Sequence, residues 1–101
     1  MRRLSEEQVN LVAARAGALA DATRVRILEV LSQSERPVGQ IAALLDCEPS
    51  LVSKHLQVLH HAGLVRRRRA ASSVIYSISA TDLPSWCRYL AMARFAPASK
   101  A

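Results

Sequence analysis

The spacing of the apolar residues changes at Gly63, and this change limits the folds that the chain can adopt. Before Gly63, apolar residues recur every three to four positions in four separate stretches, which predicts four amphipathic helices. After it, Val74, Tyr76 and Ile78 alternate with their neighbours, which predicts a strand with one buried side. A fifth helical stretch begins near residue 82. The sequence therefore predicts a mainly α fold with a β-hairpin, in the order α-α-α-α-β-β-α.

The ends of the predicted helices carry residues that commonly start and stop helices. Ser5 is followed three residues later by Gln8, which forms a capping box at the start of the first helix. Asp21 can cap the second helix, and Pro49 stands in the first turn of the fourth, where its missing N–H is tolerated. Gly63 suits the position just after that helix. Backbone chemistry and apolar spacing thus predict the same boundaries.

The region at about 38–62 has the layout of a helix-turn-helix. A short helix ends at a three-residue break, Asp46-Cys47-Glu48, and a longer helix follows. In such motifs the second helix enters the major groove of DNA. The hairpin at about 64–79 then forms a wing beside it, and we expect a single winged helix-turn-helix domain over 1–101.

Four consecutive arginines, Arg66–Arg69, lie on the first strand of the predicted hairpin, in a chain with a formal net charge of +6. Adjacent like charges repel one another, and an anionic partner relieves that repulsion. Phosphates do so while releasing counterions, which favours nucleic acid as the partner. Because side chains alternate along a strand, two of the four arginines point to each face, so not all of them need contact DNA.

Two stretches, ALADATRVRILEVL and PVGQIAALLDCEPSLVSKHLQVLHHAGLV, resemble the ArsR/SmtB family of bacterial repressors, and the similarity covers about residues 10–95. The resemblance implies a homodimer that binds double-stranded DNA at an inverted-repeat operator. It also implies a dimer interface built from the first helix and the last, the latter at about 82–95. Members of the family release DNA when they bind a metal or metalloid, when thiols oxidise, or on another signal. We therefore expect a repressor that an effector releases.

The outer side of the fourth helix supplies the candidate base contacts. Serine and glutamine side chains there can bond base edges, and a lysine can reach a base or a phosphate. The resemblance adds His55, for which the alternative is a half-buried, hydrogen-bonded histidine. The candidate DNA-binding residues are Ser50, Ser53, Lys54, His55, Gln57, Arg66, Arg67, Arg68 and Arg69. The alternative for the set is an ordinary polar helix face and a solvated run of charge.

The sequence lacks the metal sites that the resemblance suggests. The third helix reads PVGQI where arsenic and cadmium sensors of the family carry a Cys-Val-Cys motif. In the last helix Asp82 matches the first ligand of the zinc and nickel sensors, but Pro84 stands two residues on and the helix contains no histidine. His60 and His61 are adjacent and point about 100° apart, so they cannot hold one ion together. We expect no standard metal site, and the cofactor or effector is left open.

Cys47 and Cys87 are the candidate sensor thiols, with buried and chemically silent cysteines as the alternative. They suggest a second hypothesis, in which the chain is a redox-sensing or protein-binding winged helix without operator specificity. The complete set of candidate DNA contacts favours the DNA-binding regulator instead. An enzyme is not expected, because the chain has no glycine-rich phosphate loop and Cys47 and His55 lie about 12 Å apart along a helix.

Neither a membrane span nor a signal peptide is expected. No apolar run approaches the ~20 residues needed to cross a bilayer, and polar and acidic residues follow the N-terminal arginines at once. We therefore expect no membrane partner and a cytoplasmic location.

Overall fold

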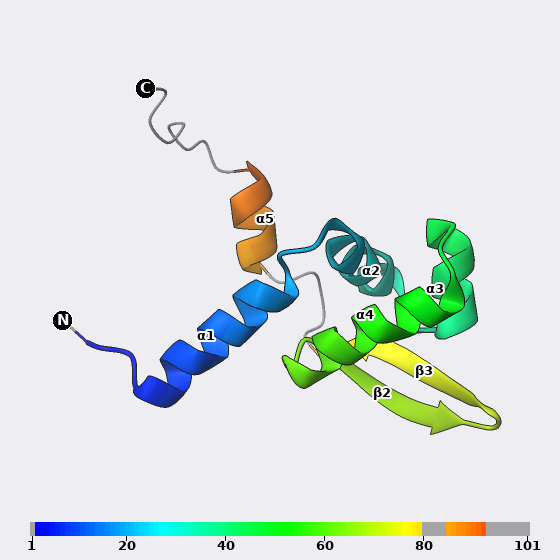
Figure 1. Ribbon diagram of the computed structural model, residues 1–101, viewed down its shortest axis with the longest axis horizontal. Helices are drawn as coiled ribbons and strands as arrows, with labels where there is room; N and C mark the ends of the chain where they lie inside the picture. The colour runs from blue at the N-terminus through cyan, green and yellow to red at the C-terminus, as the bar shows by residue number, and fades with distance from the viewer. Residues whose placement is uncertain (1, 80–84, 93–101) are drawn as a thin grey trace.

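The computed structural model describes residues 2–79 and 85–92, and its elements follow the predicted order with one addition. The elements are α1 (Glu6–Ala18), α2 (Ala22–Gln33), β1 (Arg36–Pro37), α3 (Val38–Leu45), α4 (Pro49–His61), β2 (Val65–Ala70), β3 (Ser73–Ile78) and α5 (Ser85–Met92). Figure 1 shows α3, α4 and the β2–β3 hairpin at one end of the molecule and α1 and α5 at the other. The first and last parts of the predicted 82–95 helix lie outside the described residues, as does Asp82.

Both predicted N-terminal caps are confirmed. Ser5 Oγ accepts a hydrogen bond from the Gln8 backbone N–H at 3.0 Å, and Gln8 Oε1 accepts one from the Ser5 N–H at 2.9 Å. Asp21 Oδ1 accepts the Arg24 backbone N–H at 3.1 Å. Each bond satisfies an N–H group that has no partner inside its own helix, so these residues fix where α1 and α2 begin.

The turn between α3 and α4 is built around Asp46, whose φ of 55° and ψ of 48° are left-handed. The N–H groups of Cys47 and Asp46 donate to the carbonyl oxygens of Ala42 and Ala43 at 2.9 and 3.3 Å, which closes the end of α3. Aspartate tolerates this conformation better than most residues, so the turn forms without glycine. Pro49 then opens α4 at its first position, as predicted.

Two features of the structure favour glycine at position 63, where α4 ends. Its φ of 77° is costly for a residue with a side chain, and the N–H groups of Gly63 and Leu64 bond back to the carbonyls of His60 and Leu59 at 3.0 and 2.9 Å. A Cβ atom at this position would also lie 3.1 Å from Nη2 of Arg15 in α1. Gly63 therefore permits both the turn into the hairpin and the close approach of the Arg15 side chain.

The sheet has three antiparallel strands in the order β1-β3-β2. β2 and β3 pair from Val65 opposite Ile78 to Ala70 opposite Ser73, as the hairpin pattern predicts. β1 was not expected, because the segment that contains Arg36 and Pro37 is polar and reads as a loop. Two residues are too few to show alternation, and Pro37 is tolerated because β1 is an edge strand.

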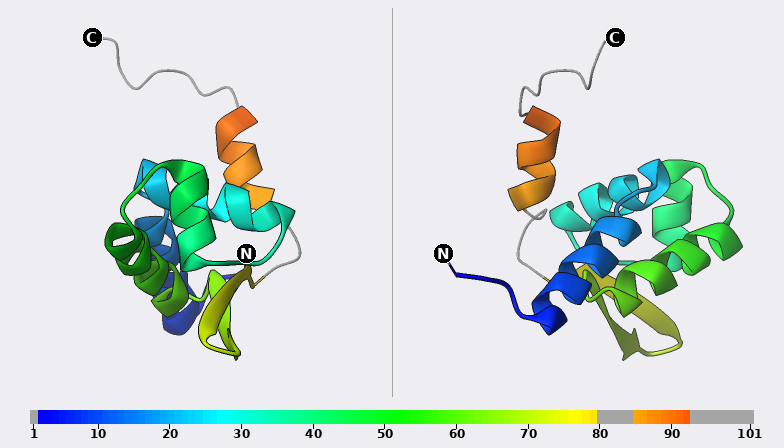
Figure 2. Two further views of the ribbon diagram at one scale, coloured as in Figure 1. Left: turned by 90° about the vertical axis from the view of Figure 1, so that its right-hand side faces the viewer. Right: turned by 60° about the vertical axis from the view of Figure 1, so that its left-hand side comes forward.

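The core lies where α2, α3 and α4 meet and is closed by the sheet (Figure 2). Tyr76 of β3 is buried, with Val74 and Ile78 partly buried on the same side of the strand, as their alternation predicts. The fully buried large side chains among the described residues are Ile27, Leu28, Ile41, Val52, Leu56 and Leu59.

The apolar rows of α1 and α5 remain uncovered. Val12 of α1 is 58% exposed and Leu90 of α5 is 56% exposed, and Val9 and Met92 are exposed as well. In the views of Figures 1 and 2, α5 projects from the body formed by the other helices. Over the described residues, no helix combines the length and hydropathy needed to cross a membrane.

Candidate nucleic-acid interface

Helix α4 separates its apolar and polar residues onto opposite sides. Val52, Leu56 and Leu59 are completely buried against the core and fix the rotation of the helix about its axis. The predicted contacts Ser50, Lys54 and Gln57 are exposed on the outer side and follow one another about one turn apart. Within the described residues their side chains form no hydrogen bond or ion pair, so these groups are available to a partner.

Ser53 and His55 are half-buried and lie at the edges of this outer row. Nδ1 of His55 lies 3.2 Å from Nη1 of Arg24, a residue of α2. The structure therefore gives His55 the hydrogen-bonded, half-buried environment that was one of its two predicted alternatives. Sequence reasoning missed Arg24, which lies in the first turn of α2 close to the Asp21 cap. The available signals were its charge and its place in a stretch that resembles the family.

The hairpin carries all four predicted arginines on β2, and all four are exposed. Arg67 and Arg69 stand opposite Tyr76 and Val74, on the face of the hairpin that continues the core side of β3. Arg66 and Arg68 are on the other face, because side chains alternate along a strand. The expected division of two arginines to each face is thus confirmed.

Arg68 differs from the other three arginines in having a partner within the chain. Its Nη2 donates to Oε2 of Glu35 at 2.6 Å, and the hydrogen bond and charge of Glu35 raise the pKa of Arg68. Arg66, Arg67 and Arg69 form no such contact with any described residue. The positive charge that is free to meet an anion is therefore concentrated on those three side chains.

The two cysteines are both free and half-buried, and they belong to different parts of the molecule. Cys47 follows α3, and its Sγ–H donates to the Leu45 carbonyl oxygen at 3.4 Å, beside a cavity of about 340 Å³. Cys87 is on α5 and faces a cavity of about 610 Å³ between α2 and α5. Burial raises the pKa of the Cys87 thiol, which lowers its thiolate fraction at neutral pH.

The rings of His60 and His61 lie edge to face, with centroids 6.3 Å apart and an angle of 69° between their planes, and their inability to hold one ion together stays a prediction. Across residues 2–79 and 85–92, no three side chains of His, Cys, Asp or Glu gather closely enough to hold a metal ion.

A helix-turn-helix whose second helix has a free polar side, followed by a basic hairpin, defines a winged helix-turn-helix domain. Residues 21–67 match the family model for bacterial regulatory proteins of the arsR family. The chain is 42% identical over 77 residues to the HTH-type transcriptional regulator Rv0081 of Mycobacterium tuberculosis, covering 75% of this chain and 65% of that relative. It is 34% identical over 73 residues to the transcriptional activator HlyU of Vibrio cholerae, covering 72% of this chain and 68% of HlyU.

The fold is also similar to a solved structure from Mycobacterium bovis, the homodimeric winged helix-turn-helix DNA-binding domain of Mb0332. The TM-score is 0.76 and the identity 31%, over 90% of this chain and 87% of that one. This chain belongs to the ArsR family of bacterial regulatory proteins. The relatives are named as transcriptional regulators and not as enzymes, in agreement with the sequence analysis.

Proposed function

We propose that this chain is a transcriptional regulator that binds an inverted-repeat operator in double-stranded DNA as a homodimer. The observation that carries the proposal is the outer row of α4, Ser50, Lys54 and Gln57, which is exposed and unpartnered within the described residues. The buried inner row of the same helix holds that outer row in a fixed orientation. A rigid helix with free donors and acceptors suits the edges of bases in a major groove.

The two parts of the interface have different roles in this proposal. Ser50, Ser53 and Gln57 bond base edges, and Lys54 reaches a base or a phosphate. The arginines of β2 neutralise phosphates, which raises the affinity for any duplex and makes it depend on salt. Sequence is thus read by α4, and the wing strengthens binding without reading sequence.

The dimer is supported by the uncovered apolar rows of α1 and α5. An apolar face such as that of Val9 and Val12 gains free energy when a second copy removes it from water. The similar domain of Mb0332 is described as homodimeric. The proposed interface therefore pairs α1 and α5 of one chain with those of another, in one domain that spans 1–101 and includes the helix at about 82–95.

The proposed regulator is a cytoplasmic repressor that an effector releases, and the two thiols are its candidate sensors. Cys47 lies two residues before the start of α4, so a bulky or charged adduct there would displace the end of the helix that enters the groove. Cys87 lines the cavity between α2 and α5, where an adduct would move the proposed dimer helix. A redox-sensing module without operator specificity is the alternative outcome of the experiment below.

The proposal is tested by selecting bound duplexes from a random library and by sedimentation of the protein at micromolar concentration. We expect enrichment of an inverted repeat and the mass of a dimer. A monomer would overturn the dimer, and recovery of duplexes with no shared sequence would overturn operator recognition. Titration of the selected complex with peroxide and with zinc then asks whether release occurs and whether Cys47→Ser abolishes it.

A further inference from the structure

Three helices meet at the side chain of Arg24. Its Nε donates to the carbonyl oxygen of Ala18 at 2.6 Å, and its Nη2 donates to that of Gly17 at 3.4 Å, both at the C-terminal end of α1. Its Nη1 donates to Nδ1 of His55 in α4 at 3.2 Å. Its own backbone N–H is held by Asp21 at 3.1 Å. One residue at the start of α2 therefore connects α1 with the middle of α4.

The charges around Arg24 fit this position. The last carbonyls of a helix carry partial negative charge and favour a cation beside them. The backbone N–H of Arg24 lowers the pKa of Asp21, and the charge of Arg24 lowers it further, so a carboxylate is kept next to the guanidinium. With its donors directed at fixed acceptors, the Arg24 guanidinium has a defined orientation toward His55.

This contact sets which nitrogen of His55 carries the proton. Guanidinium nitrogens only donate hydrogen bonds, so Nδ1 of His55 accepts and the neutral ring carries its proton on Nε2. Nε2 bonds to no described residue, and the one buried side-chain polar atom without a partner among those residues is Arg36 Nε. The Nε2 atom of His55 is therefore not fully buried, and within the described residues its N–H group is free to bond a partner outside the chain.

We propose that Arg24 is a positioning residue for DNA binding, which holds His55 so that its Nε2–H donates to an acceptor on the operator duplex. The inference rests on the proposed function and adds to it a residue that touches no DNA. The same side chain fastens α4 to α1, and Arg15 makes a second link, from its Nε to the Ala62 carbonyl oxygen at 3.0 Å.

Two substitutions of His55 separate the donor role from a purely structural link. A glutamine places its amide N–H close to the position of imidazole Nε2, and an asparagine places its amide oxygen close to that of Nδ1. His55→Gln therefore keeps the outward donor and loses the acceptor for Arg24, whereas His55→Asn does the reverse. Because neither variant changes Arg24, both remain informative if Arg24→Ala does not fold.

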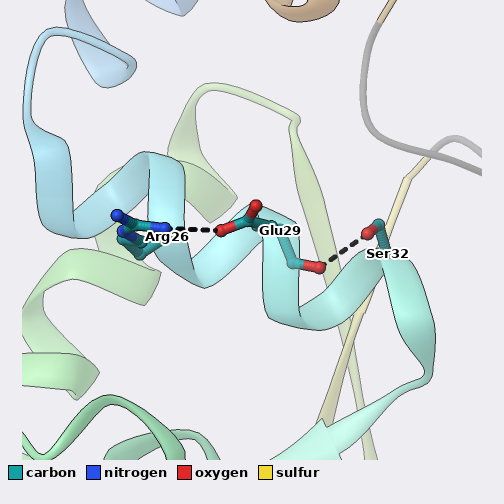
Figure 3. Close-up of polar contacts among 3 residues, drawn as sticks. All are labelled: Arg26, Glu29 and Ser32. Carbon is teal, nitrogen blue, oxygen red and sulfur yellow. Dashed lines mark hydrogen bonds and ion pairs between the residues drawn. The ribbon is translucent and has the colours of Figure 1, made fainter.

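The matched control is Arg26→Ala, two residues further along α2. Arg26 is exposed and its Nη1 pairs with Oε1 of Glu29 at 3.1 Å; Ser32 Oγ bonds the Glu29 carbonyl oxygen on the same side (Figure 3). This substitution removes the same charge from the same helix without touching α1 or α4. If Arg26→Ala produces the same effect as Arg24→Ala, the effect comes from the loss of net charge and not from the contacts of Arg24.

The first experiment records long-range ¹H–¹⁵N NMR spectra of the histidine rings in the DNA-free protein, with His55 assigned from His55→Asn. We expect wild type and Arg26→Ala to show a bare, hydrogen-bonded Nδ1 and a proton on Nε2. We expect Arg24→Lys and Arg24→Ala to show a changed Nδ1 shift and exchange between the two neutral forms. Identical His55 signals in all four proteins would overturn the inference, whether or not the chain binds DNA.

The second experiment measures affinity for a duplex recovered in the selection above and for a scrambled duplex of the same length. We expect His55→Asn to lose about tenfold in affinity, the value of one hydrogen bond, and His55→Gln to lose less. Loss on both duplexes identifies a phosphate acceptor, and loss on the selected duplex alone identifies a base. An equal or greater loss for His55→Gln would overturn the donor role. Failure of the wild type to bind DNA would instead overturn the proposed function.

Discussion

Helices α2, α3 and α4 bury a row of apolar side chains in the core, whereas helices α1 and α5 leave apolar side chains exposed. Leu56 and its neighbours on α4 are fully buried by α2, α3 and the sheet. Val12 of α1 and Leu90 of α5 are more than half exposed, although both helices are amphipathic. The apolar side chains of the first group are buried by the chain itself, whereas those of the second are left uncovered by the described residues. The same distinction holds for charge, since Arg68 has Glu35 while Arg67 and Arg69 have no partner among the described residues.

The largest effect on stability is expected for a substitution in the core. Leu56→Ala leaves a cavity in the core and should lower the free energy of unfolding by about 2–5 kcal/mol. Leu51→Ala removes the same atoms from the exposed side of α4 and should cost less than about 1 kcal/mol. Urea denaturation at one fixed protein concentration measures both. Equal losses would mean that the two sides of α4 do not differ as described.

A charge on the uncovered side of α1 should break the dimer without unfolding the chain. Val12→Asp is expected to raise the dimer dissociation constant at least about a hundredfold, because an unpaired carboxylate would be buried in the interface. Ala14→Asp puts the same charge on the opposite side of the helix and should change it by less than about threefold. Sedimentation equilibrium gives the constants and circular dichroism reports folding. A full dimer in Val12→Asp would place the interface elsewhere.

The arginines of the wing allow the same comparison, because Arg68 pairs with Glu35 whereas Arg67 and Arg69 pair with no described residue. Replacing Arg67 and Arg69 by alanine should flatten the slope of log K against log salt by roughly 2 per engaged subunit, at about 0.9 per phosphate. Replacing Arg66 and Arg68 should flatten it less, because Glu35 already holds Arg68. Fluorescence anisotropy from low to moderate salt measures the slopes. If wild type and both double variants share one slope, the arginines are a solvated charge run that touches no phosphate.

The smallest effect concerns the cap of α2. The Asp21 carboxylate has a lowered pKa, first because it accepts the Arg24 backbone N–H. Its charged form therefore stabilises the fold at neutral pH, and that contribution is lost as the pH falls below about 4, through the folded-state pKa. Asp21→Asn keeps the cap but not the charge. In urea denaturation from pH 7 to pH 3, the free energy of unfolding of Asp21→Asn should be slightly below that of wild type at pH 7, and the difference should disappear in acid. A difference that does not depend on pH would contradict this account.

The sequence predicts the elements of this fold well because their signals are local. The Ser5 and Asp21 caps, the left-handed turn at Asp46 and the stop at Gly63 each depend on residues within one helical turn. β1 was missed because two residues show no period, and its pairing with β3 depends on contacts about forty residues away.

The candidate site was predictable in its outline and not in its contacts. The exposed row of α4 follows from helical periodicity once the buried row is known. The partners of His55 and Arg68 are Arg24 and Glu35, which lie 31 and 33 residues away in the sequence. Only the packing of α2 against α4 and of the sheet brings those pairs together, and no local pattern encodes them.

The central claim is that the outer row of α4, together with Ser53 at its edge, reads sequence while the wing only holds the duplex. It is tested most directly by the ratio of affinities for the selected and scrambled duplexes in the variant Ser53→Ala, Lys54→Ala. The account predicts that this ratio falls, with about 1–3 kcal/mol of discrimination lost for each base contact removed. If both affinities instead fall by the same factor and the ratio is unchanged, these residues only bind phosphates and the claim is wrong.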